Sequence, residues 1–397
     1  MDGVPGLTQQ PIAPGAAFVY EFTAPDPGTY FYHPHTGTQL DTGLYAPLIV
    51  EDPAEAGRYD REITLMLDDW IDGIGGSPDE VLERLQGGGS EMEGMEGMEG
   101  MEGMEDMPGM GTGQAAEVTM GAATGARTSE GPLGDDTGDV DYPLYVVNGR
   151  PPTDPPVFDV GLGEQVRLRL VNAGSDTPFR VAVRGSDLTV VATDGFPVSP
   201  TRTDAILLGM GERYDAVVTI DAEGVFPLVA EAESKGGRAL AVLRTGAGPL
   251  PGPEVDVPEL RGRLLGPEDL SATAETSLPA GRPDRTYELA LTGDMAAYRW
   301  GIEVVGGGEL SVQQGERVRL VLDNRTSMWH PIHLHGTTFQ VLAPGGVAGP
   351  RKDTVIVPAS GRVAIEFIAD NPGRWALHCH NIYHAEAGMQ TVLTVAP

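Results

Sequence analysis

Two segments with the same alternating pattern constrain the fold more than any other feature of the chain. Val166, Leu168 and Leu170 alternate with polar residues in GEQVRLRLVNAG, which begins at Gly163. The same alternation occurs in GERVRLVLDNRT, which begins at Gly315, 152 residues later. A period of two predicts strands with one buried face. The repetition predicts a duplicated β-domain. With 55 glycines, 33 prolines and 6% aromatic residues, the short β-branched segments predict an all-β chain of sandwiches or barrels.

A second internal match joins the two ends of the chain. PGTYFYHPH, residues 27–35, aligns without a gap on PGRWALHCH, residues 372–380, at a constant offset of 345 (372 minus 27). Two domains are therefore expected to share an ending. The first copy keeps the paired histidines but has Pro34 where the second has Cys379.

The last domain also carries HPIHLHG, whose His333 precedes His378 by 45 residues. The same spacing applied to His33 and His35 gives positions −12 and −10 (33 and 35, each minus 45), before Met1. We therefore expect the first domain to be incomplete, without its N-terminal half. The alternative is a first domain that never had an upstream histidine pair, which would leave half a sandwich unable to close its core.

Five segments follow from these patterns. Residues 1–62 are the C-terminal half of the first domain, and 63–139 connect it to the next. Residues 140–246 form a middle domain that contains neither His nor Cys, so we expect it to serve as a spacer and an interface. Residues 247–284 are a Pro-rich linker. Residues 285–397 form the last domain.

The charge of the chain limits its partners. Its 58 acidic residues against 26 Lys and Arg leave a net charge of -32, which disfavours nucleic acids and anionic membranes as partners. No apolar run approaches the roughly 18 residues of a membrane span. The opening MDGVPG lacks the charged and apolar regions of a signal peptide. A single cysteine excludes an intrachain disulfide.

The eight histidines gather in three short groups. These are His33 and His35; His330, His333 and His335; and His378, His380 and His384. Cys379, His384 and Met389 follow a Cys-x4-His-x4-Met spacing, and His330 completes the set. A thiolate and two imidazoles with a weak thioether are the ligands of a blue-copper electron-transfer site. The competing interpretation is an ordinary buried thiol beside surface histidines.

The remaining histidines form three His-x-His pairs: HPH, HLH and HCH. Such a pair on a strand directs both imidazoles to one face, so pairs on facing strands can surround one or more metal ions. One pair alone would be weak evidence, and three make coincidence hard to sustain. Cys379 lies between His378 and His380, so a single strand would join the blue-copper site to the second cluster through covalent bonds.

These motifs resemble those of the multicopper oxidases, the laccase-like and cuprous-oxidase family. HPH, HPIHLHG and HCHNIYHAEAGM are similar to three of the four copper motifs of that family. The resemblance covers most of the chain and implies three tandem cupredoxin-like Greek-key β-sandwich domains, the first of them incomplete. It also implies four copper ions. By position, the type 1 copper ligands would be His330, Cys379, His384 and Met389; His333 would bind type 2 copper; and His33, His35, His335, His378 and His380 would bind type 3 copper.

The resemblance further implies an activity. One-electron oxidation of phenols, aromatic amines or cuprous ions would be coupled to four-electron reduction of dioxygen to water, in an extracytoplasmic location. Asp2 is similar to an acidic residue that moves protons near the cluster, although a turn residue in Asp-Gly-Val-Pro is the competing interpretation. The alternative function is a truncated copper protein that holds type 1 copper and transfers electrons without reducing dioxygen.

Methionine recurs at every third position in a low-complexity tract within residues 87–139. The repeating residues are Met92, Met95, Met98, Met101, Met104, Met107 and Met110. Glu and Gly between them predict a mobile, acidic loop rather than a packed element. Thioethers are soft ligands, so the tract is either a collector of cuprous ions or a drifted repeat that binds nothing.

Overall fold

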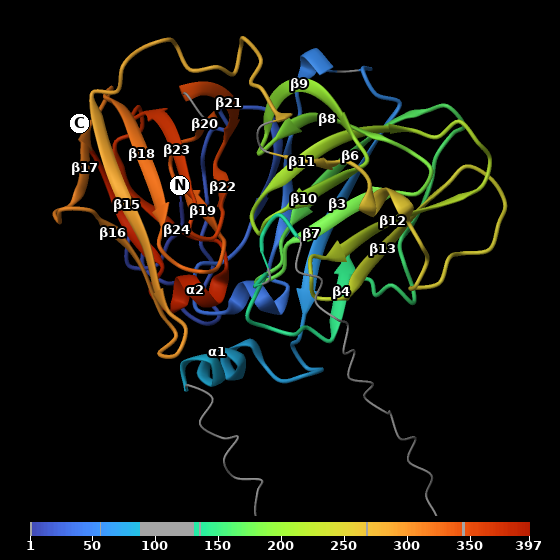
Figure 1. Cartoon of the computed structure of the whole chain (residues 1–397), viewed down its shortest axis with the longest axis horizontal. Helices are drawn as coiled ribbons and strands as arrows, with labels where there is room; N and C mark the ends of the chain where they lie inside the picture. Colours follow the sequence, from blue (N-terminus) through green and yellow to red (C-terminus); the bar gives the residue numbers. More distant parts are fainter. Residues whose placement is uncertain (1, 56, 88–130, 135, 267–268, 344–345) are drawn as a thin grey trace, which may run out of the picture.

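The structure, a computed structural model, describes most of the chain. The described residues are 2–55, 57–87, 131–134, 136–266, 269–343 and 346–397. They are mostly strands, which confirms the predicted all-β class. Two β-sandwiches lie side by side, and two short helices, α1 (Pro78–Gln86) and α2 (Ile382–Glu386), lie toward one end of their junction (Figure 1).

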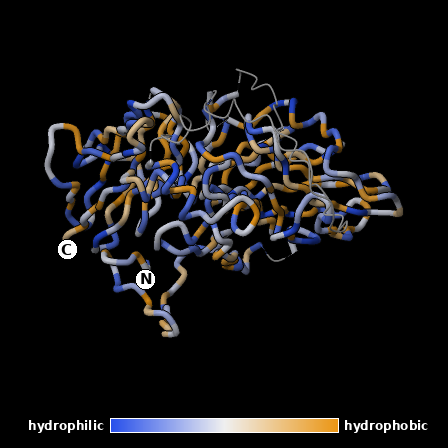
Figure 2. The backbone as a smooth tube through the Cα atoms, turned by 90° about the horizontal axis from the view of Figure 1, so that it is seen from below, coloured by the Kyte–Doolittle hydropathy of each residue, from blue (hydrophilic) through white to orange (hydrophobic). Residues whose placement is uncertain are grey.

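The middle sandwich is built from two six-stranded sheets. The first sheet contains, in spatial order, β14 (Leu264–Leu265), β10 (Ala205–Leu208), β7 (Phe179–Val183), β12 (Val225–Ala232), β13 (Arg238–Arg244) and β5 (Val157–Asp159). The second contains β4 (Leu144–Val147), β3 (Arg61–Trp70), β6 (Gln165–Asn172), β11 (Arg213–Thr219), β8 (Leu188–Thr193) and β9 (Phe196–Thr203). Hydrophobic and hydrophilic residues are interspersed along the backbone (Figure 2).

The last sandwich has a six-stranded and a five-stranded sheet. The first contains β16 (Arg299–Val304), β15 (Arg285–Asp294), β18 (Arg317–Asn324), β23 (Arg362–Ile368), β20 (Phe339–Ala343) and β21 (Val347–Lys352). The second contains β17 (Leu310–Gln313), β25 (Gln390–Ala396), β24 (Gly373–Cys379), β19 (His330–Leu334) and β22 (Thr354–Val357). In this sheet β19 pairs with β24, with Ile332 opposite Cys379 and His333 opposite His378, so two of the histidine groups meet across one ladder.

The N-terminal part of the chain forms a small open sheet. β1 (Gly28–Tyr32) pairs antiparallel with β2 (Ala46–Val50), and two 3-10 turns, η1 (Gln39–Thr42) and η2 (Pro53–Glu55), follow the strands. Several apolar side chains of this region are exposed, including Val19 at 79% and Tyr32 at 62%. The hairpin carries His33 and His35 to the junction of the two sandwiches.

Two of the predicted segments contain more structure than expected. β3 begins at Arg61 and pairs in parallel with β6, so the segment assigned as a connection from residue 63 contributes a central strand to the middle sandwich. The predicted linker 247–284 contains η3 (Pro258–Arg261) and β14, which pairs with β10. Local patterning missed both because their partner strands lie at least about 60 residues away, well beyond any local window.

The predicted one-sided burial holds for one repeat and fails for the other. In β18 buried and half-buried positions alternate, as predicted. In β6 every residue after Gln165 is buried. The guanidinium groups of Arg167 and Arg169 are covered because the buried carboxylate of Asp215 pairs with both of them. No helix in the described ranges is both long and apolar enough to cross a membrane.

Candidate copper site

Three side chains from separate elements converge between the sheets of the last sandwich. The Cys379 sulfur at the end of β24 lies 3.9 Å from His330 Nδ1 on β19 and 3.8 Å from His384 Nδ1 on α2. All three are fully buried, and their ligand atoms lie within 4.8 Å of one another. Met389 is also fully buried, and its backbone carbonyl accepts a hydrogen bond from the Cys379 amide at 3.0 Å. The sequence spacing therefore closes into one pocket.

Each imidazole of this pocket is held by its outer nitrogen. His330 Nε2 lies 2.8 Å from the Thr326 hydroxyl, and His384 Nε2 lies 2.8 Å from the Asp139 carboxylate. The Asp139 carboxylate accepts a hydrogen bond from the Nε2–H group of His384. The unprotonated Nδ1 of His384 then faces the Cys379 sulfur. Burial raises the pKa of the Cys379 thiol, so the free thiol stays protonated, and a soft cation is needed to hold it as a thiolate.

An indole forms one wall of the pocket. The Trp300 ring lies 4.1 Å from the His384 ring and 5.3 Å from the His330 ring, between centroids. Tyr298, two residues earlier, donates a hydrogen bond to Asp139 at 2.7 Å. The His384 side chain is only 1% exposed, so bulky solutes have no direct access to its imidazole.

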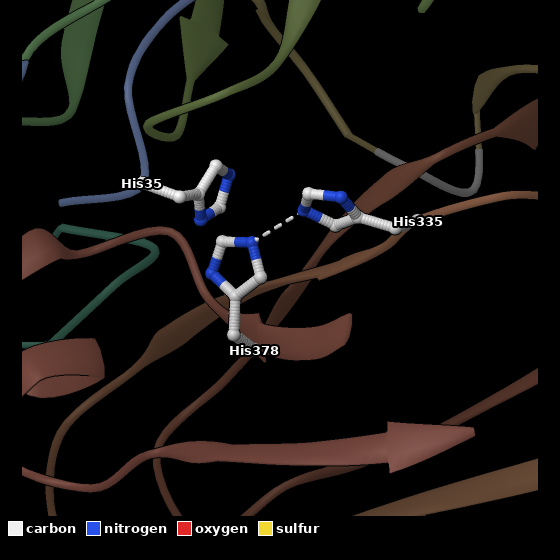
Figure 3. A group of neighbouring side chains, drawn as sticks. All are labelled: His35, His335 and His378. Carbon is white, nitrogen blue, oxygen red and sulfur yellow. Dashed lines mark hydrogen bonds between the residues drawn. The ribbon is translucent and has the colours of Figure 1, made fainter. Parts of the chain in front are cut away.

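Six further imidazoles form a second cluster on the other side of Cys379. Nitrogen atoms of His35, His335 and His378 lie within 4.8 Å of one another, and Figure 3 shows the three rings converging from different segments of the chain. His335 Nε2 and His378 Nε2 are 3.0 Å apart. His33 and His380 lie 4.9 Å apart and His333 and His335 lie 4.7 Å apart, between ring centroids. The three predicted His-x-His pairs therefore meet.

Most of these rings are oriented through Nδ1. His378 Nδ1 donates to the Cys379 carbonyl at 2.7 Å, and His33 Nδ1 to the Pro34 carbonyl at 3.1 Å. His335 Nδ1 lies 2.5 Å from the Asp2 carboxylate. A ring held in this way presents its Nε2 lone pair to the cluster.

The cluster fits a group of metal ions. His380 Nδ1 is buried and has no hydrogen-bond partner among the described residues, which suits a nitrogen that binds a metal. Burial lowers the pKa of His33 to about 3 and lowers the pKa of His35 and His378 well below the usual range. These imidazoles are therefore neutral at pH 7, as metal ligands must be.

Comparisons with known proteins agree with this geometry. Family models described as multicopper oxidase match residues 1–55, 115–248 and 283–397. The chain is 45% identical over 402 residues to multicopper oxidase MmcO of Mycobacterium tuberculosis, covering 99% of this chain and 74% of that protein. This chain belongs to the multicopper oxidase family. It is a copper-binding oxidoreductase by that membership.

Other relatives of this multicopper oxidase are more distant. A copper resistance protein A homolog of Pseudomonas syringae pv. tomato is 30% identical over 487 residues, covering 98% of this chain and 80% of that protein. The crystal structure of Fet3p, a multicopper oxidase that functions in iron import, matches with a TM-score of 0.74 at 22% identity, covering 99% and 77% of the two chains. At that identity the structural match supports the cupredoxin-like fold alone.

The structure brings together the eight histidines and Cys379 in two clusters, Met389 contacts Cys379 through its backbone, and Asp2 contacts the second cluster through His335. The Met92–Met110 repeat lies outside the described residues. Asp139, Thr326 and Trp300 were missed. Asp139 lies 245 residues before His384, and no motif marks it.

A group of buried carboxylates adjoins the blue-copper pocket of the oxidase. Asp41, Asp68 and Asp69 are at most 1% exposed. Asp41 Oδ2 accepts hydrogen bonds from the phenols of Tyr142 and Tyr383, the residue before His384. Burial, reinforced by neighbouring carboxylates, raises the pKa of Asp41 and of Asp68 well above the usual range.

Replacing Asp41 with asparagine is expected to stabilise the copper-free protein at neutral pH. When folding raises the pKa of a carboxyl, its contribution to the stability of the folded protein is fully present below its unfolded pKa of about 3.9, where the group is protonated in both states. That contribution is lost as the pH rises through the folded pKa. Asparagine stays neutral and keeps an oxygen for both phenols. We expect the free energy of unfolding at pH 7 to rise by about 1–3 kcal/mol. Urea unfolding of the wild type and the variant at pH 5 and pH 7.5 checks this. If the free energy of unfolding changes by the same amount between the two pH values in both proteins, the prediction is wrong.

Proposed function

We propose that this multicopper oxidase couples one-electron oxidation of a donor to four-electron reduction of dioxygen to water. One observation carries the proposal. The Cys379 sulfur lies within 4 Å of a nitrogen of each blue-copper imidazole, while its chain neighbours His378 and His380 belong to the second cluster. A single strand end thus joins a site suited to one-electron transfer to a site with room for several ions.

The proposed ligand roles follow the family resemblance, and the convergence of the side chains in two clusters supports them. We assign His330, Cys379, His384 and Met389 to type 1 copper, His333 to type 2 copper, and His33, His35, His335, His378 and His380 to type 3 coppers, four ions in all. Bound copper supplies the redox chemistry, with the soft thiolate and thioether suited to the cuprous state. The protein excludes water from the thiol, and burial lowers the pKa of His33, His35 and His378, which keeps these imidazoles neutral.

Asp2 is the proposed proton-transfer group. Its carboxylate accepts a hydrogen bond from His335 Nδ1. Asp2 also lines a cavity of about 710 Å³, whose wall includes His33 and His35. A carboxylate in that position can pass protons from the solvent side of the cavity toward reduced dioxygen.

Cuprous ion is the donor we favour over phenols and aromatic amines. The burial of His384 behind Asp139 and Trp300 restricts contact with an aromatic ring, whereas a net charge of -32 attracts cations to the protein. A copper resistance protein A and a copper resistance protein A homolog are 28% and 30% identical to this chain over 98% of its length. We also propose an extracytoplasmic location, which the family resemblance implies.

The alternative is electron transfer without dioxygen reduction. The described cluster contains three His-x-His pairs, whereas the family resemblance implies four. Dioxygen uptake by the copper-loaded protein decides between the two functions. Four donor electrons consumed per dioxygen, with a type 2 signal in the electron paramagnetic resonance spectrum, support the oxidase. A blue band without either result supports electron transfer alone.

Deleting residues 91–110 tests the predicted collector of cuprous ions. Seven methionines are lost with this segment, and seven thioethers are a large part of the soft ligand set. We expect cuprous oxidation to fall about tenfold or more and phenol oxidation to change little, because the blue-copper ligands stay in place. Steady-state rates with both donors measure the effect. If the deletion lowers the oxidation rates of both donors equally, the tract does not act as a collector of cuprous ions.

A further inference from the structure

We propose that residues 209–213 of the middle sandwich, which comprise the turn between β10 and β11 and the first residue of β11, position two histidines of the second cluster. Arg213 acts on His333 through Asp353, and Gly211 acts on His380 by direct packing. The inference rests on the proposed function for its consequence, since it assigns the middle sandwich a part in holding the type 2 and type 3 ligands. It gives the interface role expected of this domain a specific form.

Arg213 forms a bidentate ion pair with Asp353 across the junction between the two sandwiches. Its Nη1 and Nη2 atoms each lie 2.6 Å from an oxygen of the Asp353 carboxylate, and the Arg213 side chain is 4% exposed. Its Nε donates to the Thr29 carbonyl at 3.2 Å. A planar fork that matches a carboxylate fixes both distance and orientation, which a single charge does not.

Asp353 in turn fixes the ring of His333. The Asp353 carbonyl accepts a hydrogen bond from His333 Nδ1 at 2.9 Å, and the Thr354 hydroxyl lies 3.1 Å from the same nitrogen. Because a carbonyl only accepts, Nδ1 carries the proton and the lone pair is on Nε2. An outer group that sets the tautomer and orientation of a ligand histidine strengthens metal binding.

The middle sandwich also holds the backbone on which this depends. Asp194 Oδ2 accepts hydrogen bonds from the amides of Asp353 and Thr354, at 3.3 and 3.2 Å. Asp194 Oδ1 accepts from the amide of Arg213 at 2.9 Å. One buried carboxylate therefore ties both ends of the Arg213–Asp353 pair together.

Gly211 contacts the other histidine directly. A Cβ at this position would lie 2.5 Å from His380 Cδ2 and 2.7 Å from Cγ, and the backbone has φ +82°, which favours glycine. His380 Nδ1 has no hydrogen-bond partner in the described part of the chain, so packing sets the orientation of this ring. The glycine allows the turn to lie flat against the imidazole.

The first test uses copper-free protein with ¹⁵N-labelled histidine and long-range ¹H–¹⁵N spectra. In Arg213→Gln the His333 resonances are expected to lose the pure Nδ1–H tautomer pattern, and Arg213→Lys is expected to recover it in part. Arg167→Gln is the matched control, because Arg167 is equally buried and pairs with Asp215 and Glu55 instead. A His333 pattern unchanged in Arg213→Gln, or equally changed in Arg167→Gln, would overturn the role of Arg213.

The second test concerns His380 and copper binding. Gly211→Ala is compared with Gly185→Ala, which has a similar φ of +75° but no atom within 4 Å of its added Cβ. Only Gly211→Ala should shift the His380 resonances, and identical spectra for the two variants would overturn the role of Gly211. In copper-loaded protein, Arg213→Gln should bind type 2 copper about 10- to 100-fold more weakly, with the blue band retained. If wild-type protein consumes no dioxygen while the copper-free spectra behave as expected, the proposed function fails and the positioning role stands.

Discussion

Cys379→Ser is expected to abolish the blue colour of the copper-loaded protein and to reduce donor oxidation more than about 100-fold. Loss of an outer group that only orients a ligand typically costs 10- to 100-fold, so loss of the sulfur ligand itself should cost more. The hydroxyl fits the same space, yet it is a hard ligand that a copper site of this type does not use. Visible absorption, copper content and steady-state oxidation of both donors measure the result.

Met389→Leu is the matched comparison for the cysteine variant. Both side chains are fully buried, but the thioether is proposed to be only a weak ligand, and leucine replaces it with similar volume. We expect Met389→Leu to stay blue with a changed redox potential. Retention of the blue band in Cys379→Ser would show that the sulfur at this position does not bind the type 1 copper.

Part of the Cys379 pocket could be predicted from the sequence. The spacing from Cys379 to Met389 marked these three residues as candidate ligands because they follow one another along a strand end, a short helix and the residue just before β25. His330 was predicted as the remaining partner, and it enters from the neighbouring strand β19. Local alternation also predicted β18, whose two faces differ in burial.

The groups that hold the ligands in place were not predictable in this way. Asp139, Asp353 and Arg213 act through contacts between parts of the chain that are 140 to 245 residues apart. Acidic residues are common in this sequence, so no composition or spacing distinguishes these from surface carboxylates. Their roles depend on burial, which follows from the way the two sandwiches and the N-terminal hairpin meet.

Asp176 is the residue where this dependence is greatest. It is fully buried, and its Oδ2 lies 2.5 Å from Lys235 Nζ, itself 5% exposed. Its Oδ1 accepts a hydrogen bond from Asn381 Nδ2 at 2.6 Å and one from the Asp139 amide at 3.1 Å. Asn381 caps α2, which carries His384, so a middle-sandwich carboxylate holds two elements of the blue-copper pocket.

Asp176→Asn is therefore expected to lower the free energy of unfolding by about 3–5 kcal/mol, because the buried Lys235 ammonium loses the carboxylate with which it forms its ion pair. Urea unfolding of the copper-free protein measures this loss. Asp159→Asn, which breaks an exposed pair with Arg244, serves as the control and should change stability little. We also expect a shifted blue band in copper-loaded Asp176→Asn, since both Asn381 and Asp139 lose a charged acceptor.

The double variant Asp176→Asn/Lys235→Met separates the two effects of Asp176. Removing the ammonium removes the buried charge that has lost its ion-pair partner, so most of the lost stability should return. The blue band should stay shifted, because the methionine does not restore the carboxylate that Asn381 and Asp139 contact. If the band returns to its wild-type position together with stability, Asp176 acts only by balancing Lys235. If it stays shifted in a fully stable protein, the middle sandwich orients the ligands of a copper that it does not itself bind.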